Sequence, residues 1–153
     1  PKRMCSIDVA WSVVKNHSSF LVKRGRGSDR GQAVFSAEKG NLRNKHSIRY
    51  SGLLNTKAVD ISGDKDGSAV LSVKRKGMAQ KPSAMFASSK LPRKHGFRKG
   101  VRAINNATSG TYYRHDLRRA ALARWSAITR NAKNRRAQGH GRVMTVPEAP
   151  QKK

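Results

Sequence analysis

The chain carries far more positive charge than a folded domain of its size requires. Its 153 residues include 34 Lys and Arg but only 8 Asp and Glu, so the formal net charge is +26. Residues 1–80 hold 16 basic and 6 acidic groups, and residues 81–153 hold 18 and 2. A compact molecule with this charge repels itself unless a polyanion neutralises it. Because Lys and Arg displace the counterions of phosphates, the expected partner is nucleic acid.

The apolar content limits the size of the core and the choice of compartment. Hydrophobic residues make up 36% of the chain, below the ~45–50% (glycine included) of an ordinary domain. We therefore expect one small domain with extended appendages. No apolar run reaches the ~20 residues of a membrane-spanning helix, so a membrane is not an expected partner. The single Cys5 cannot form an internal disulfide, and no secretory signal is evident, which favours a cytoplasmic or nuclear protein.

The first residues predict a short helix at residues 8–15. Trp11 and Val14, together with Val13, would face inward. Ser6 or Asp8 could accept the free amide hydrogens of the first turn. We expect Trp11 to be buried between this helix and a sheet.

The strands of that sheet are predicted by β-branched and alternating segments. The segments are residues 20–22, which run into Lys23 and Arg24, and residues 47–50, 57–61 and 69–73. Residues 25–31 read as a flexible loop, and the Asp-Gly pair within residues 63–67 favours a hairpin turn. Residues 1–82 therefore predict an α+β module, a small antiparallel sheet with a packed N-terminal helix.

The pattern then changes to a helical period, which predicts a basic helical region at residues 83–132. Phe97, Val101 and Ile104 share one helical face, and a break follows at Ser109-Gly110. Asp116 could cap a second helix, and the apolar stripe of that helix is Leu117, Ala121, Trp125, Ile128 and Ala132. Residues 133–153 show no sustained period and read as an extended basic tail.

Motifs for chemistry are weak in this sequence. The glycines of residues 25–31 match neither a dinucleotide fingerprint nor a Walker A loop. The acidic residues 60, 64 and 66 lack the first carboxylate and the terminal glutamate of a calcium loop. The five histidines are scattered, and no nucleophile is paired with a base along the chain. We expect no catalytic site, no metal and no cofactor.

Basic residues are the remaining candidates for function. Residues 93–142 contain 14 of them against a single acid, Asp116. Arg is well suited to this role because its planar fork binds phosphate in a bidentate manner and stacks on bases. Tyr112 and Tyr113 belong to no apolar stripe, whereas Phe97 and Trp125 are expected in the core. The candidate RNA-binding residues are Lys23, Arg24, Arg26, Arg43, Arg49, Lys74, Arg75, Lys76, Arg93, Lys94, Arg98, Lys99, Arg102, Tyr112, Arg114, Arg118, Arg119, Arg124, Arg130, Lys133, Arg135, Arg136 and Arg142.

Several ordered motifs resemble one known family. They are WSVVKNHSSFLVKR at residues 11–24, NL at 41–42, SIRYSGL at 47–53, VKRK at 73–76, KP at 81–82, YRHDLRRAA at 113–121 and SAI at 126–128. Together they resemble the eukaryotic large-subunit ribosomal protein family numbered twenty-eight. The resemblance is close over residues 9–82, apart from a looser match at residues 25–40, and it is close again over residues 112–130. Residues 83–110 match loosely, and the segment after Lys133 hardly matches at all.

The resemblance implies a structural protein of the large ribosomal subunit that binds ribosomal RNA and supports translation without catalysis. It also implies neighbouring ribosomal proteins as partners, no small-molecule substrate, a cytoplasmic location and assembly in the nucleolus. The alternative is a chromatin or other DNA-binding protein, because two basic helices around Gly110 could imitate a helix-turn-helix. Against it, the apparent connection of residues 107–115 exceeds the ~3–4-residue turn of that motif.

Overall fold

The computed structural model describes residues 6–25, 32–64, 68–78, 81–91 and 96–140. The elements follow in the order α1 (Ile7–Val14), β1 (Leu21–Arg24), β2 (Ala33–Ser36), β3 (Val59–Gly63), β4 (Ala69–Lys74), β5 (Phe86–Leu91), α2 (Gly96–Asn105), a π-helical turn η2 (Asn106–Gly110), a 3-10 turn η3 (His115–Leu117) and α3 (Arg118–His140). This mixture of antiparallel strands, an N-terminal helix and C-terminal helices confirms the predicted α+β class.

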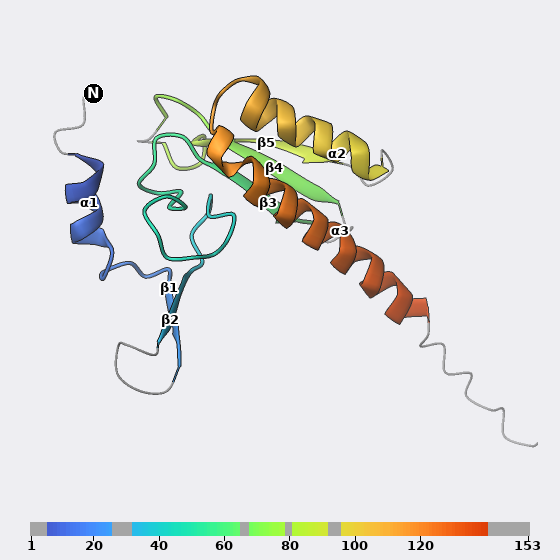
Figure 1. Cartoon of the computed structure of the whole chain (residues 1–153), viewed down its shortest axis with the longest axis horizontal. Coiled ribbons are helices and arrows are strands. Elements are labelled where there is room, and N and C mark those ends of the chain that lie inside the picture. The colour runs from blue at the N-terminus through green and yellow to red at the C-terminus, as the bar shows by residue number, and fades with distance from the viewer. Residues whose placement is uncertain (1–5, 26–31, 65–67, 79–80, 92–95, 141–153) are drawn as a thin grey trace, which may run out of the picture.

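The larger sheet is antiparallel, in the order β3-β4-β5. The expected hairpin is confirmed, because Val59 pairs with Val73 and Gly63 pairs with Ala69. Helices α2 and α3 lie on the same face of this sheet (Figure 1). Since successive side chains of a strand point to opposite faces, every second residue of β3 and β4 reaches the helices.

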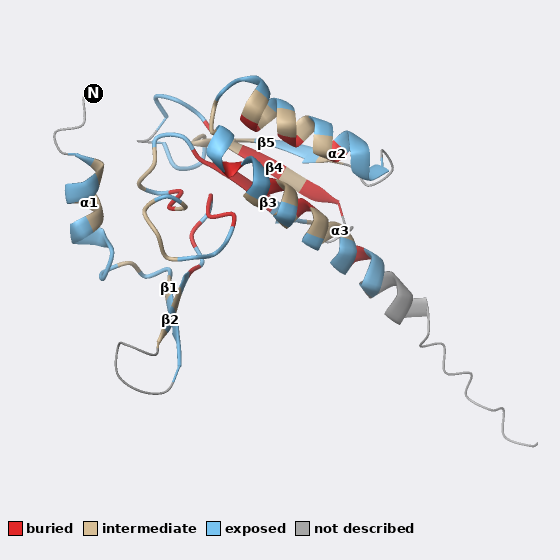
Figure 2. Ribbon diagram, in the orientation of Figure 1, coloured by how far each residue is buried: buried red, intermediate tan, exposed pale blue. Residues whose placement is uncertain are grey.

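The core lies between this sheet and the two helices, where the buried residues gather (Figure 2). Val59, Ile61 and Leu71 from the strands meet Ile104 from α2. The apolar stripe predicted for the second helix is also confirmed, since Leu117, Ala121, Trp125 and Ala132 are buried and Ile128 packs against the cluster. Trp125 stacks on Phe97 with ring centroids 6.1 Å apart. The prediction that Phe97 lies in the core is wrong, because its side chain is 48% exposed at the edge of this contact.

The N-terminal helix was placed correctly along the chain and incorrectly in space. The side chain of Ser6 accepts the expected hydrogen bond from the amide of Val9 (3.4 Å). However, α1 buries none of its residues, and it lies apart from the three-stranded sheet (Figure 1). The prediction that Trp11 is buried against the sheet is therefore wrong. Its half-buried indole instead contacts the ring of His46, with centroids 4.8 Å apart.

A second, two-stranded sheet pairs β1 with β2, in the register Leu21 to Ser36 and Arg24 to Ala33. The prediction of a strand at residues 20–22 is thus nearly right, whereas β2 was not predicted. The predicted loop at residues 25–31 lies, apart from Gly25, outside the described residues.

The predicted strand at residues 47–50 is wrong, because this segment forms a turn. The amides of Tyr50 and Ser51 both donate to the carbonyl of Ser47, each at 3.1 Å. Directly after the turn, Gly52 lies against the backbone of Gly40, and a Cβ added to Gly52 would come within 2.1 Å of the Lys39 carbonyl oxygen. This close backbone approach brings residues 40 and 52 together, so residues 47–50 lie within a loop that the two glycines close.

Three features of the second half also differ from the prediction: one strand, the end of α3 and the role of Asp116. Strand β5 was missed because its sequence, FASSKL, has little apolar alternation, yet it pairs with β4 over its full length. Helix α3 continues through His140, so residues 133–140 are helical and not extended. Ala, Lys, Arg and Gln have high helix propensity even without an apolar stripe. Finally, the described contacts of the Asp116 carboxylate are with Arg114 and Arg49, and not with the amides of a helix that it would cap.

Within the described segments, no helix is both long enough and apolar enough to cross a bilayer.

Candidate nucleic-acid interface

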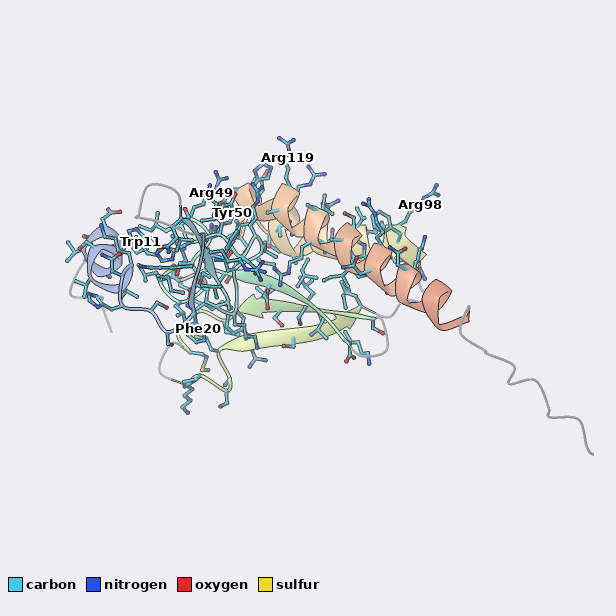
Figure 3. All side chains as sticks on the ribbon, turned by 90° about the horizontal axis from the view of Figure 1, so that it is seen from below. Trp11, Phe20, Arg49, Tyr50, Arg98 and Arg119 are labelled. Carbon is cyan, nitrogen blue, oxygen red and sulfur yellow. The ribbon has the colours of Figure 1, made fainter. Side chains whose placement is uncertain are left out.

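A basic groove of about 640 Å³ lies between residues 42–50 and the first turns of α3. Four arginines contribute to its walls, namely Arg43, Arg49, Arg119 and Arg124, together with the ring of Tyr50. Arg49, Tyr50 and Arg119 lie close together at this end of α3, whereas Arg98 lies farther along the molecule (Figure 3). The groove therefore gathers arginines that are up to 81 positions apart in the printed sequence, from 43 to 124.

Arg114 fixes one wall of the groove through a network of hydrogen bonds. Its Nε and Nη2 donate to the two carboxylate oxygens of Asp116 at 2.8 and 2.9 Å. Its Nη1 donates to the carbonyl of Lys57 at 2.9 Å, and Nη2 also donates to the carbonyl of Arg49 at 3.0 Å. One side chain thus ties the start of the C-terminal helices to two loops of the first half.

The same network pairs the carboxylate of the groove, Asp116, with arginine side chains. The hydrogen bond from Arg114 lowers the pKa of the Asp116 carboxyl, and the nearby charges of Arg114 and Arg49 act in the same direction. Arg49 Nε lies 3.4 Å from Asp116 Oδ2, with the Arg49 side chain 55% exposed. Asp116 is therefore ionised at neutral pH, but the four arginines of the groove outnumber this one carboxylate, so the groove retains a net positive charge.

The ring of Tyr50 positions two of the arginines. The guanidinium carbons of Arg43 and Arg49 each lie 5.9 Å from the ring centroid, within the range of a cation–π contact. Both arginines are exposed, as is Arg119 on the opposite wall. Arg49 Nη2 also donates to the Asp116 carbonyl at 3.3 Å. Exposed guanidinium groups around one groove can bind phosphate oxygens, and the planar forks of Arg43 and Arg119 are suited to bidentate contact.

Arg124 lines the groove, but its guanidinium group is held by hydrogen bonds inside the protein. Its Nε donates to the carbonyl of Ile61 at 2.6 Å, and its Nη1 donates to the carbonyls of Asn41 (3.2 Å) and Leu42 (3.0 Å). It therefore joins α3 to β3 and to the loop before the groove.

Lys74 is also occupied inside the protein. It is buried, and its Nζ donates to the carbonyls of Gly52 (2.8 Å), Leu53 (3.1 Å) and Asn55 (2.8 Å). A phosphate could reach it only if the loop opened and left these carbonyls without donors, which costs free energy. We therefore leave Lys74 and Arg124 out of the proposed interface.

The tyrosine pair divides into one structural and one exposed residue. The Tyr113 hydroxyl donates to the carbonyl of Lys74 and accepts from the amide of Ala58 at 3.3 Å. Burial raises the pKa of the Tyr113 hydroxyl. Tyr112, by contrast, is 84% exposed.

The other predicted residues spread over several surfaces. Arg98, Lys99 and Arg102 are exposed on α2, and Arg118 Nε donates to Asn105 Oδ1 at 2.9 Å. The remaining exposed candidates are Lys23, Arg24, Arg75, Lys76, Arg130 and Lys133. Arg26, Arg93, Lys94 and Arg142 lie outside the described residues, and for Arg135 and Arg136 only the helical backbone is described.

Sequence reasoning missed Lys57, which is exposed and lies over the ring of Tyr113 with Nζ 5.5 Å from the centroid. A single lysine between a threonine and an alanine carries no signal of its own, so only the fold reveals this position. Across the described segments, no cluster of three or more His, Cys, Asp or Glu could hold a metal ion.

Comparison with known proteins identifies the family. Residues 9–131 match the ribosomal L28e protein family. The chain belongs to this family. It is 35% identical over 124 residues to the large ribosomal subunit protein eL28 of Schizosaccharomyces pombe, covering 80% of this chain and 90% of that protein. The eL28 protein of Dictyostelium discoideum is 37% identical over 122 residues, covering 78% of this chain and 83% of its own length. The eL28 protein of Caenorhabditis elegans is 38% identical over 85 residues, covering 55% and 64%.

The match also supports the resemblance drawn from the motifs. The family region includes the groove arginines, the Arg114 network and Tyr112, because all of them fall within residues 9–131. All the residues that line the groove therefore lie within the part of this chain that matches the family.

Proposed function

We propose that this protein is a structural constituent of the large ribosomal subunit and that it stabilises ribosomal RNA through Lys and Arg contacts to phosphate. Membership of the L28e family carries this proposal. The net charge of +26 and the exposed arginines of the groove support it. The role is one of scaffolding for translation, without catalysis and without a small-molecule substrate. Its partners are ribosomal RNA and neighbouring ribosomal proteins, in cytoplasmic ribosomes that are assembled in the nucleolus.

The groove offers a mechanism for RNA binding. Arg43, Arg49 and Arg119 each present a guanidinium group that can bind a phosphate oxygen, and the internal bonds of Arg114 and Arg124 keep the walls in place before RNA arrives. A preorganised site loses less side-chain entropy on binding than a flexible one. Contacts of this kind read the shape and backbone of RNA and carry little sequence information.

Contacts are proposed to be denser in the second half of the chain. Residues 93–142 hold 14 basic groups in 50 positions, whereas residues 1–80 hold 16. The exposed cations of α2 and α3 and the basic segment after residue 132 would then make more phosphate contacts per residue than residues 1–80, although both helices share one core with the sheet. A ribosome structure tests this division by the number of phosphate contacts per residue in the two ranges.

A chromatin or other DNA-binding role is the second candidate, and the geometry of the helices argues against it. Residues 106–117 separate α2 from α3, whereas a helix-turn-helix has a turn of about 3–4 residues. The apolar stripe of α3 packs on the sheet, and both helices lie on one face of it (Figure 1). α3 is therefore not presented as a free recognition helix.

Fractionation of gently lysed cells separates the two functions. We expect the tagged full-length protein to sediment with large ribosomal subunits and to be absent from the chromatin fraction. Replacing Arg43, Arg49 and Arg119 together by Ala should reduce its share in the subunit peak, whereas Lys15→Ala, an exposed residue just after α1, should not. Recovery of the protein mainly with chromatin would refute the ribosomal proposal.

A further inference from the structure

Tyr112 has an unusual combination of backbone and side-chain properties. Its φ is +46°, in the left-handed region that residues with a Cβ rarely adopt, and its side chain is 84% exposed. An exposed tyrosine gains no burial from this conformation, so packing of its own ring does not explain it. Strained backbone that is held in place by its surroundings is common at binding sites.

The neighbours of Tyr112 hold it in this conformation. Its amide donates to the carbonyl of Ser109 at 3.1 Å, and the amide of Arg114 donates to the carbonyl of Thr108 at 3.4 Å. The next residue, Tyr113, is anchored to Lys74 and Ala58 through its hydroxyl. The ring of Tyr112 therefore projects from a fixed segment between η2 and η3.

The segments that contact Tyr113, the residue next to Tyr112, carry several cations. Lys57 lies over the ring of the adjacent Tyr113, with its exposed ammonium group 5.5 Å from the centroid. The exposed Arg75 and Lys76 directly follow the Lys74 carbonyl that accepts the Tyr113 hydrogen bond. Residues 109–111 are Ser, Gly and Thr, which provide no apolar rim for a protein partner. An exposed aromatic ring on a surface that also carries cations is the combination that proteins use for unpaired nucleotides.

We propose that Tyr112 is a stacking platform for one unpaired base of RNA, and that Lys57 and the Arg75–Lys76 pair bind the phosphates that flank this base. The inference rests on the proposed function and specifies which form of RNA the site takes. A duplex does not fit the platform, because its bases are stacked on each other and hide their faces. An unpaired base offers a free π-face whatever its identity, so the site selects structure more than sequence.

The test compares two RNA hairpins that differ only in one unpaired 2-aminopurine in the stem. Wild-type full-length protein should bind the hairpin with the unpaired base more tightly and quench its fluorescence. Tyr112→Phe, which keeps the ring, should retain both effects. Tyr112→Gly should lose about 5- to 150-fold in affinity for the bulged hairpin, as expected for one stacked base, and keep its affinity for the paired one.

Two further measurements make the outcome decisive. Tyr112→Gly should unfold at the same or a higher temperature than wild type, because glycine adopts a positive φ without strain. A loss of binding therefore cannot come from misfolding. Equal losses on both hairpins, or no loss on either, would overturn the platform. A third result would also overturn it. If Tyr112→Gly binds RNA like wild type but fails to enter ribosomes, the ring contacts a protein and not a base. If wild type binds neither hairpin, the proposed function itself fails.

Discussion

The indole ring of Trp125 lies directly on the backbone of Gly100. A Cβ added to Gly100 would come within 2.3 Å of Trp125 Cζ2 and 2.6 Å of Cε2. Trp125 Nε1 also donates to the carbonyl of Phe97 at 3.4 Å. The absence of a side chain at position 100 therefore sets how closely α2 and α3 approach each other over the sheet.

Gly100→Ala should destabilise the protein even though alanine favours a helix. The added methyl must push the indole away, and overpacking of this kind costs about 1–3 kcal/mol of unfolding free energy. Urea unfolding followed by tryptophan fluorescence measures the change. Gly110→Ala is the control, because its nearest neighbours would lie 3.8 Å from the new Cβ. Equal stabilities of the two variants would show that the contact is not a constraint.

Trp125→Ala should cost about 3–5 kcal/mol, the usual range for a buried large aromatic residue. Trp125 is only 5% exposed, so most of that range applies. In the Trp125→Ala background the clash at position 100 disappears, and Gly100→Ala should become neutral or stabilising. A double-mutant cycle in urea tests this coupling. Additive effects of the two substitutions would contradict direct contact between the residues.

Arg124 and Arg119, five positions apart on α3, should behave in opposite ways. Arg124→Ala removes donors from the carbonyls of Ile61, Asn41 and Leu42 and should cost at least about 1.5–3 kcal/mol of stability. Arg119→Ala changes an exposed side chain and should stay within about 0.5 kcal/mol of wild type. In RNA binding, Arg119→Ala should lower the slope of log affinity against log salt by about 1. Similar stability losses for the two variants would remove the distinction between structural and interface arginines.

Affinity for RNA should fall steeply with salt. A surface that makes even 6–10 phosphate contacts loses about 10³–10⁵ in affinity between 50 and 200 mM salt. Filter binding of the full-length protein to a simple RNA hairpin measures the slope. Little preference among duplexes of different sequence is expected, because duplex RNA is recognised mainly by shape and backbone. A flat salt dependence is incompatible with binding through phosphates.

The ion pair of Asp116 should make stability depend on pH at the acid end. Arg114 lowers the folded-state pKa of this carboxyl. Its contribution is therefore complete above the unfolded pKa of about 3.9 and is lost as the pH falls through the lower, folded value. Asp116→Asn should cost less than about 1 kcal/mol at pH 7, because the carboxylate is 38% exposed and solvent screens it. The difference from wild type should shrink as the pH falls below the unfolded pKa, as urea unfolding at several pH values can show.

Local patterns predicted the elements that carry their own signal. The apolar stripe of α3 follows from the spacing of Leu117, Ala121 and Trp125, and the β3–β4 hairpin follows from an Asp-Gly turn between two apolar strands. Strand β5 was missed because it forms by pairing with β4 and contains no apolar alternation of its own. The strand predicted at residues 47–50 was wrong for the opposite reason. Its residues are strand-like, but the segment forms a turn within the loop that the contact between Gly40 and Gly52 closes.

The sequence by itself determined the charge, which predicts a polyanionic partner, and the motifs of the family. Only the tertiary structure decided which of the cations are buried or held by several internal hydrogen bonds and which remain exposed. Lys74, Arg114 and Arg124 look like any other basic residue in the chain, yet their donors bind carbonyls 19 to 83 positions away. Arg43, Arg49 and Arg119 face the groove and remain exposed. The physical reason is that the charge of a side chain follows from the residue type alone. The carbonyl that accepts its hydrogen bond comes from a distant part of the chain and reaches that position only after folding.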